Sequence, residues 1–264
     1  MEKPKLRIIH NMARSGGTLI SKCLGCMQGT VLLSEIHPLA WQNFNPVMQA
    51  QTWFGLLTPA DMAKLEQQPT TFGDAIALIE QRSRDRGDKL ILRDWNHLDY
   101  TGYPFISSPG YQPLLFMELE GHFDIIRLSI ARDPVAQWLS LTQFLMTSNM
   151  LKQEPPDLDK FLLGYRKYAE LCVETGFIRY EDFLRKPEET MRQSCDRLKI
   201  FFDPEFIDHW HEYKTITGDV IGTRGGNEIK PLPPPSVQPG LKEKFLANAD
   251  YHRAIELLGY DPVC

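Results

Sequence analysis

The stretch from residue 6 to residue 27 constrains the fold most, because it reads as a strand, a glycine-containing turn and a helix in direct succession. Residues 6–10, with Leu6, Ile8 and Ile9, read as a buried strand. After the turn, apolar side chains recur with the helical period of about 3.6 residues. Gly16 and Gly17 let the chain turn sharply and bring backbone N–H groups close to a ligand. Because the first N–H groups of a helix attract anions, this segment predicts a phosphate-binding loop.

The loop differs from the one that binds nucleoside triphosphates. That loop carries a Lys immediately before a Ser or Thr, whereas here Gly17 precedes Thr18. The cation of the loop is Arg14, which comes before the glycines. Taken alone, the segment is also compatible with an ordinary turn between a strand and a helix.

Strand and helix patterns alternate through the rest of the chain. Apolar runs predict strands at 30–33, 89–92, 124–131 and 176–180, with helical patterns between them. This alternation predicts an α/β fold, a three-layer sandwich whose central parallel sheet is flanked by helices. Ligands bind at the carboxyl ends of the strands in such sheets. The first candidates for a site are therefore the charged or titratable residues that follow the strands: Arg14, Glu35, His97, Arg132 and Glu181.

Size and charge limit the kinds of partner. The 264 residues fit one large α/β domain or two small ones. The net charge of −5 argues against nucleic acid or an anionic membrane as the main partner. No apolar run reaches the ~18 residues of a membrane span, and the first strand begins too early for a signal peptide. We expect a cytoplasmic protein with reduced cysteines, and the oligomeric state cannot be read from the sequence.

A second candidate site follows the strand at 124–131. Asp133 can cap the next helix, and Pro134 suits its first position. Ser140 lies eight positions after Arg132, about two helical turns along. A guanidinium and a hydroxyl at this spacing can bind one phosphate group. The alternative is that Arg132 pairs with a nearby acidic residue and Ser140 is a plain helix residue.

These segments together resemble the sulfotransferases that use 3′-phosphoadenosine 5′-phosphosulfate (PAPS). R-S-G-x-T resembles their loop for the 5′ end of the donor, and R-D-P with the following Ser resembles their 3′-phosphate site. Residues 178–187 resemble the strand-to-helix segment R-Y-E-D-L-x-x-x-P, whose role is mainly structural, and residues 224–226 resemble a C-terminal R-x-G turn over the 3′-phosphate. With Arg in the loop instead of Lys, the chain looks closer to bacterial and tyrosylprotein-type P-loop sulfotransferases than to the cytosolic enzymes.

The resemblance implies a donor site and an organisation of the domain. PAPS would be the donor, 3′,5′-diphosphoadenosine (PAP) the product, and no metal is expected. A single sulfotransferase domain over 1–264 would carry a helical and loop insertion at about 39–88 and a cofactor-covering segment at about 218–240. The residues implied in donor binding are Arg14, Ser15, Gly16, Gly17, Thr18, Leu19, Arg132, Ser140, Arg224 and Gly225.

Two residues compete for the role of the base that accepts the acceptor's proton. In tyrosylprotein-type and heparan-modifying members a Glu about twenty residues past the loop cation has this role, and Glu35 lies 21 positions after Arg14. Cytosolic members use a His in a K-T-H context, and the sequence around His97 departs from it in spacing and neighbours. Arg14 is expected to stabilise charge on the leaving group. We therefore expect Glu35, or else His97, to be the base.

The expected reaction is in-line transfer of a sulfuryl group to a hydroxyl of a small or carrier-bound acceptor. Aromatic residues at 39–57 and 100–117 suggest an apolar wall for that acceptor, and the loop at 99–113 looks functional. One alternative is a small-molecule kinase of the same architecture, against which the missing Lys counts. Another is a non-catalytic nucleotide-binding protein of this fold.

Overall fold

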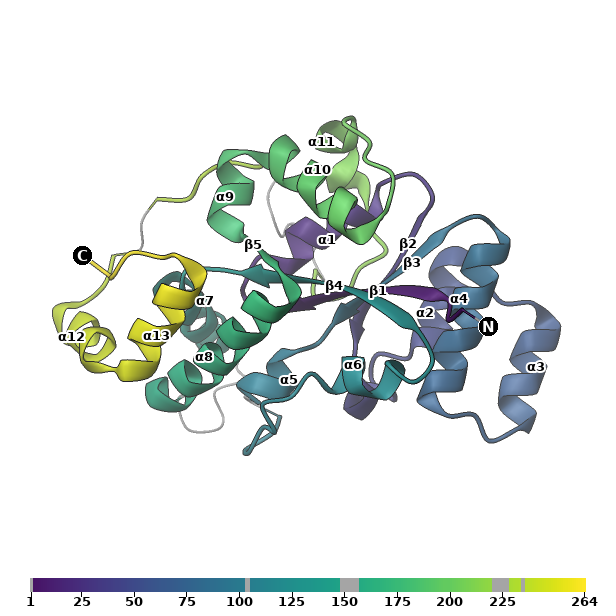
Figure 1. Ribbon diagram of the computed structural model, residues 1–264, viewed down its shortest axis with the longest axis horizontal. Helices are drawn as coiled ribbons and strands as arrows, with labels where there is room; N and C mark the ends of the chain where they lie inside the picture. The colour runs from purple at the N-terminus through teal and green to yellow at the C-terminus, as the bar shows by residue number, and fades with distance from the viewer. Residues whose placement is uncertain (1, 103–104, 148–156, 220–227, 234–235) are drawn as a thin grey trace.

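The computed structural model of the chain describes residues 2–102, 105–147, 157–219, 228–233 and 236–264. A five-stranded parallel sheet with the order β2-β3-β1-β4-β5 forms its centre, and helices cover both faces (Figure 1). This confirms the predicted α/β sandwich. The strands are β1 (Lys5–Asn11), β2 (Thr30–Ile36), β3 (Lys89–Asp94), β4 (Asp124–Ala131) and β5 (Phe177–Arg179).

Successive side chains of β1 point into different cores, as the period of a strand requires. Ile9 packs in a cluster with the first of two helix layers, whereas Leu6 and Ile8 pack in a cluster on the opposite face. The first layer holds α1 (Gly17–Gly25), α9 (Tyr180–Arg185), α10 (Pro187–Leu198), α11 (Phe206–His209) and the 3-10 turn η3 (Trp210–Glu212). Because both faces are covered, the central strands are rich in buried apolar residues.

The second layer has two parts along the opposite face. Near β2 and β3 lie η1 (Pro38–Ala40), α2 (Pro46–Phe54), α3 (Pro59–Gln67), α4 (Phe72–Asp85) and α6 (Leu114–Leu119). Near β4 lie α5 (His97–Tyr100), α7 (Pro134–Thr147), α8 (Leu158–Thr175), α12 (Pro239–Ala247) and α13 (Ala249–Leu258).

Capping side chains fix the starts of several helices. Thr58 and Asp61 form a reciprocal capping box at the start of α3, and Thr71 accepts a hydrogen bond from the backbone N–H of Asp74 at the start of α4. Helix α2 was not predicted, because its apolar residues show no clear period. It begins where Asn45 caps the chain and Pro46 takes the first helical position.

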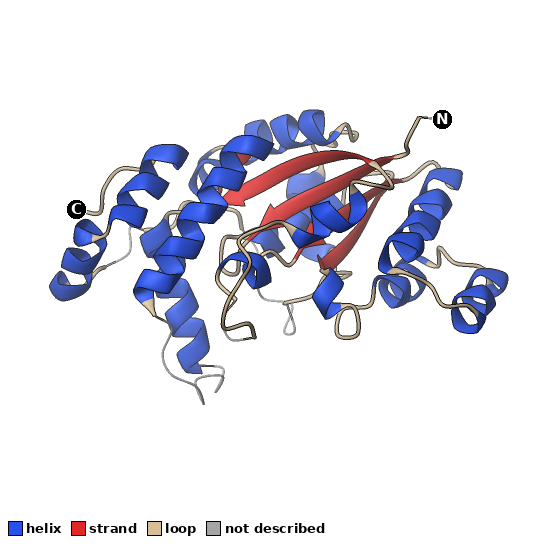
Figure 2. Ribbon diagram, turned by 60° about the horizontal axis from the view of Figure 1, so that its bottom comes forward, coloured by secondary structure: helices blue, strands red, loops and turns tan. Residues whose placement is uncertain are grey.

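All five strands run in the same direction, so their carboxyl ends meet at one edge of the sheet (Figure 2). The loops that follow β1, β2, β3 and β4 therefore lie close together, as the sequence predicts for a ligand site. Among the described residues, no helix is both long and apolar enough to cross a membrane.

Candidate active site

The loop after β1 has an unusual backbone that brings the start of α1 into a pocket. Arg14 and Gly16 both adopt left-handed conformations, with φ of 66° and 86°. A Cβ atom on Gly16 would lie 2.2 Å from the ring of Tyr180, so only glycine fits there. The loop is held from outside by Gln137, whose Nε2 donates to the carbonyl of Ala13 over 2.8 Å. The first N–H groups of α1 have no acceptor within the helix and can serve an anion.

A pocket of about 390 Å³ opens at this edge of the sheet, between the loop after β1, the ends of β2 and β3, and α7. It brings together most of the residues that the sequence singled out: Arg14, Gly16, Gly17, Thr18, Leu19, Glu35, His97 and Arg132. Ser15 is fully buried behind the loop, where its hydroxyl donates to the carbonyl of Met12. Arg224 and Gly225 lie outside the described residues.

The two arginines that sequence analysis assigned to opposite ends of a donor are in direct contact. Arg132 donates from Nη1 to the carbonyl oxygen of Arg14 over 2.8 Å. The side chain of Arg14 in turn donates from Nε to Ser140 Oγ over 3.0 Å, and its guanidinium lies 5.3 Å from the ring centre of Phe144. The guanidinium of Arg14 is thus on the Ser140 side of the loop, whereas the sequence led us to expect it at the leaving group.

A second pocket, of about 720 Å³, adjoins the first and contains Ser140. Arg132 and Tyr180 line both pockets, and the guanidinium of Arg132 lies 5.2 Å from the centre of the Tyr180 ring. The other walls come from α7, α9, residues 231–233 and residues 260–264. The two pockets together could hold an elongated ligand with Arg132 near its middle.

Glu35 reaches the pocket because β2 is irregular there. The register between β2 and β3 shifts between Leu33 and Ile36, and Glu35 has a φ of 57°. The preceding residue, Ser34, has both backbone groups bonded to the side chain of Gln49, at 2.7 and 2.8 Å. Left-handed backbone in a residue other than glycine costs about 1 kcal/mol or more and is typical of functional sites. The predicted strand ended at 33, so this irregularity was not foreseen.

Arg93, the next-to-last residue of β3, is a site residue that sequence analysis missed. Its side chain is 2% exposed and lies between α1 and β2. Nη1 donates to Thr18 Oγ1 over 3.1 Å, and Nη2 lies 3.1 Å from Glu35 Oε1. The signal was present in the sequence, because Arg93 follows an apolar strand as Arg132 does.

His97, the rival base, lies in a more apolar part of the same pocket. It is 6% exposed, and its ring lies 4.8 Å from that of Trp95 and 6.1 Å from that of Phe105. Burial, together with the positive charge of Arg93, lowers the pKa of His97 to about 3. The imidazole is therefore neutral near pH 7 and is a much weaker base than free histidine.

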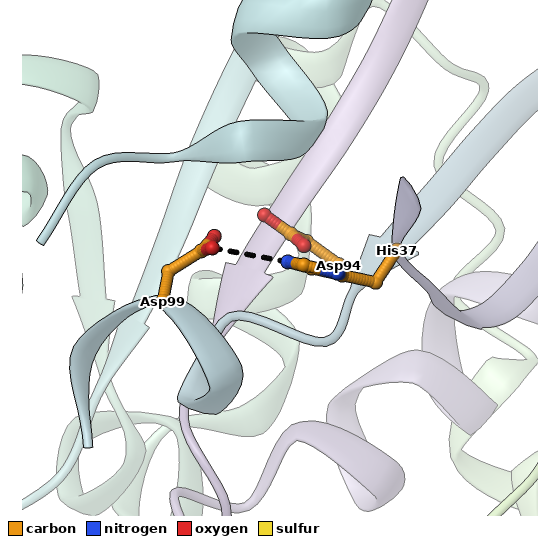
Figure 3. Close-up of side chains that lie close together, drawn as sticks. All are labelled: His37, Asp94 and Asp99. Carbon is orange, nitrogen blue, oxygen red and sulfur yellow. Dashed lines mark hydrogen bonds and ion pairs between the residues drawn. The ribbon is translucent and has the colours of Figure 1, made fainter. Parts of the chain in front are cut away.

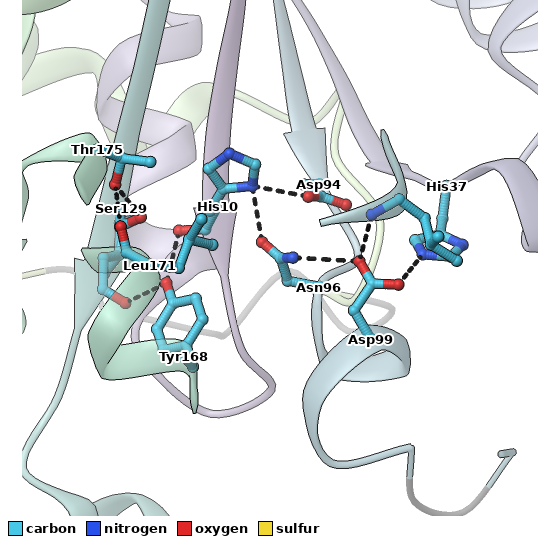
Figure 4. A network of polar contacts seen from close by, with 11 residues as sticks. His10, His37, Asp94, Asn96, Asp99, Ser129, Tyr168, Leu171 and Thr175 are labelled. Atoms are coloured by element: carbon cyan, nitrogen blue, oxygen red, sulfur yellow. Dashed lines mark hydrogen bonds and ion pairs between the residues drawn. The ribbon is translucent and has the colours of Figure 1, made fainter. Parts of the chain in front are cut away.

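Behind the pocket, a buried polar network joins the ends of β1, β2 and β3. Asp99 accepts a hydrogen bond from His37 Nε2 at 3.0 Å (Figure 3). It also accepts hydrogen bonds from Asn96 Nδ2 (3.3 Å) and from the backbone N–H of Leu114 (3.2 Å). His10 Nδ1 contacts Asp94 at 2.7 Å and Asn96 at 2.8 Å (Figure 4). The network fixes both ends of the segment that contributes Trp95, His97 and Phe105 to the pocket.

The spacing of His37, Asp94 and Asp99 would allow them to surround a metal ion, since one ligand atom of each lies within 4.8 Å of the others. His37 Nδ1, however, accepts the backbone N–H of Leu39, so Nε2 carries the proton that it donates to Asp99. Neither nitrogen then has a lone pair for an ion. Hydrogen bonding within the protein accounts for this cluster.

Glu181 has a structural role in this arrangement. One of its oxygens accepts the backbone N–H of Asp133 over 3.0 Å, and the other accepts the hydroxyl of Tyr260 over 2.8 Å. Glu181 thereby ties the loop after β4 to the C-terminal residues. This agrees with the mainly structural role that the resemblance implies for its segment.

Three solved structures whose fold matches this chain over nearly its whole length are sulfotransferases. The sulfotransferase domain of the Synechococcus PCC 7002 olefin synthase matches with a TM-score of 0.67 and 20% identity, over 99% of this chain and 97% of that domain. The sulfotransferase domain from the curacin biosynthetic pathway matches with a TM-score of 0.66 and 17% identity, over 100% of both chains. A sulfotransferase from Alicyclobacillus acidocaldarius gives 0.50 and 16%, over 99% and 98%.

No protein-family model and no curated protein matches the sequence. The likeness therefore concerns the fold, and it extends over nearly the whole chain. The chain therefore has the fold of these sulfotransferases.

Proposed function

We propose that the protein transfers a sulfuryl group from PAPS to a hydroxyl group of a small or carrier-bound acceptor. The observation that carries this proposal is the convergence of Arg14, Arg132 and Ser140 beside the free start of α1. The nucleotide part of PAPS carries one phosphate on the 3′ carbon and one on the 5′ carbon of its ribose. It matches a site with one cationic cluster and one helix N-terminus a short distance apart.

In this proposal the 3′-phosphate of the donor binds Arg132, Ser140 and the guanidinium of Arg14. The 5′-phosphosulfate lies at the loop and at the N–H groups of residues 16–19. Tyr180 stands at the boundary of both pockets, where its ring can contact the adenosine. Arg224 and Gly225 remain predictions from the sequence, as does the covering role of the segment at about 218–240.

Transfer needs a group that accepts a proton and groups that stabilise negative charge. The acceptor oxygen forms a bond to sulfur while the bond from sulfur to the bridging oxygen of the 5′-phosphate breaks, and the acceptor's proton goes to Glu35. Arg93 and the N–H groups of the loop stabilise charge that develops around the leaving oxygen. Glu35 is favoured over His97, whose low pKa makes it a poor base near neutral pH.

Calorimetry tests donor binding first. We expect PAP to bind much more tightly than adenosine 5′-monophosphate, which lacks the 3′-phosphate, and more tightly than ATP with Mg²⁺. Preference for ATP with Mg²⁺ would favour the kinase alternative.

Transfer is then measured with radiolabelled PAPS and a panel of free and carrier-bound hydroxyl compounds, with and without a chelator of divalent ions. Product that forms equally well in excess chelator supports the proposal. Tight PAP binding without transfer to any acceptor would instead indicate a non-catalytic nucleotide-binding protein.

A further inference from the structure

A segment far along the chain, residues 213–219, reaches the candidate site from the side opposite α7. It crosses α1 and the end of β2, and Gly218 lines the first pocket. We propose that Thr217 in this segment is a positioning residue that orients Arg93 toward Glu35 and Thr18. The inference rests on the proposed sulfuryl transfer, in which Arg93 and Glu35 act.

Thr217 binds the guanidinium of Arg93 through two oxygen atoms. Arg93 Nη2 donates to the backbone oxygen of Thr217 at 3.3 Å and to its hydroxyl at 3.1 Å. The same nitrogen lies 3.1 Å from Glu35, while Nη1 donates to Thr18. Thr217 thus lies on the side of the Arg93 guanidinium that faces the candidate base. Because the guanidinium is planar and rigid, the contacts of Nη2 also set the direction of Nη1.

Ser34 fixes the hydroxyl of Thr217 in turn. Ser34 Oγ lies 2.7 Å from Thr217 Oγ1 and accepts the backbone N–H of Thr217 at 3.1 Å. Ser34 is fully buried, and it immediately precedes the strained Glu35. The residue that sets the direction of Arg93 is therefore tied to the same turn of β2 that directs Glu35 into the pocket.

Contacts on both sides of Thr217 hold the segment in place. Before it, the ring of Tyr213 packs so closely on α1 that a Cβ atom on Gly25 would lie 2.4 Å from Tyr213 Cζ. After it, Asp219 forms an ion pair with Lys22 of α1, and both side chains are almost completely buried. A segment anchored at two points can hold a side chain in one orientation, as positioning requires.

Thr217→Val removes the hydroxyl and keeps the β-branched shape, whereas Thr217→Ser keeps the hydroxyl. We expect Thr217→Val to lower kcat about 10- to 100-fold, the equivalent of one hydrogen bond to a charged group, with the Kd for PAP changed less than twofold. Thr217→Ser should stay within about threefold of wild type. The matched control is Thr52→Val on the exposed side of α2, which should leave kcat unchanged.

An unchanged kcat in Thr217→Val would overturn the inference. A loss of PAP affinity at unchanged kcat would also overturn it, because Thr217 would then bind the donor. A second measurement does not depend on turnover: the Tm values of Thr217→Val, Arg93→Met and the double variant. We expect the two shifts to be clearly non-additive, and additive shifts would contradict the contact even if the wild-type protein transfers nothing. Absence of transfer in wild type would count against the proposed function alone.

Discussion

The guanidinium of Arg93 lies 3.1 Å from the carboxylate of Glu35, across the two neighbouring strands β2 and β3. Arg93 is almost completely buried, whereas the side chain of Glu35 is 19% exposed toward the pocket. A carboxylate in this position can face an acceptor while a fixed positive charge stands beside it. In the proposed function, sulfuryl transfer takes place between this pair and the loop after β1.

Glu35→Gln should remove the base without changing the shape of the site. We expect turnover to fall about 100- to 10,000-fold, the range for loss of a general base, while the Kd for PAP stays close to wild type. Steady-state kinetics and calorimetry on the same preparation check this. His97→Gln is the comparison variant. If Glu35→Gln keeps wild-type turnover and His97→Gln loses it, His97 is the base.

The left-handed backbone at Glu35 predicts that glycine at this position is more stable than alanine. Glu35→Ala keeps a Cβ atom at a φ of 57°, whereas Glu35→Gly removes it. We expect the Gly variant to have a free energy of unfolding about 1 kcal/mol higher than the Ala variant. Urea denaturation of both variants measures this difference. At an ordinary strand position Ala would be the more stable residue, so a more stable Ala variant would contradict strain at this site.

Gly16→Ala should damage the loop in two ways. The position has a φ of 86°, and the new Cβ would lie 2.2 Å from the Tyr180 ring that lines both pockets. We expect a loss of about 1–3 kcal/mol in stability, together with at least tenfold weaker PAP binding. Gly29→Ala is the matched control, since φ there is 69° but nothing lies within 4 Å of the added atom. Equal effects of both changes on PAP affinity would argue against a donor site at the loop.

The low pKa of His97 predicts how its contribution to stability depends on pH. Buried among apolar groups and near His37 and Arg93, His97 stays neutral in the folded protein down to a pH of about 3, whereas in the unfolded chain it binds a proton below about 6.5. Between these values the unfolded state binds more protons, so this contribution falls as pH falls, by at most about 1.4 kcal/mol per pH unit.

The test compares wild type with His97→Gln at several pH values. The free energy of unfolding of wild type relative to the variant should be constant above pH 7.5 and should decrease from pH 6.5 to pH 4.5. Other groups, such as His10, titrate in both proteins, so the difference isolates His97. A difference that does not vary with pH would show that His97 is accessible to protons in the folded state.

Periodicity predicted the parts of the fold that depend on burial. β4 has the predicted bounds, because apolar residues recur along a buried strand. Helix α2 follows no such repeat, and α5 falls in a segment that reads as a loop. Short helices whose residues are buried by several different neighbours leave no period in the sequence.

In the candidate site, too, local patterns predicted some features and missed those that depend on tertiary contacts. Residue type and position at strand ends were enough to select Arg14, Glu35 and Arg132, since parallel strands bring their carboxyl ends to one edge. The same reasoning applied to Arg93 would have selected it too. Ser140 was selected by its spacing from Arg132 along the following helix. The direction of the Arg14 side chain, toward Ser140 of α7, depends on a contact between residues 126 positions apart, which no local pattern encodes.

By itself the sequence determined the parallel sheet, the loop before α1 and the set of charged residues around it. Apolar periodicity and the alternation of strands with helices can both be read along the chain. Only the tertiary structure decided that Glu35 leaves the regular strand, that Arg93 stands beside it, and that Thr217 and Ser34 hold both. Those relationships arise from hydrogen bonds between segments up to 183 residues apart, and their geometry exists only once the sheet and its helices have packed.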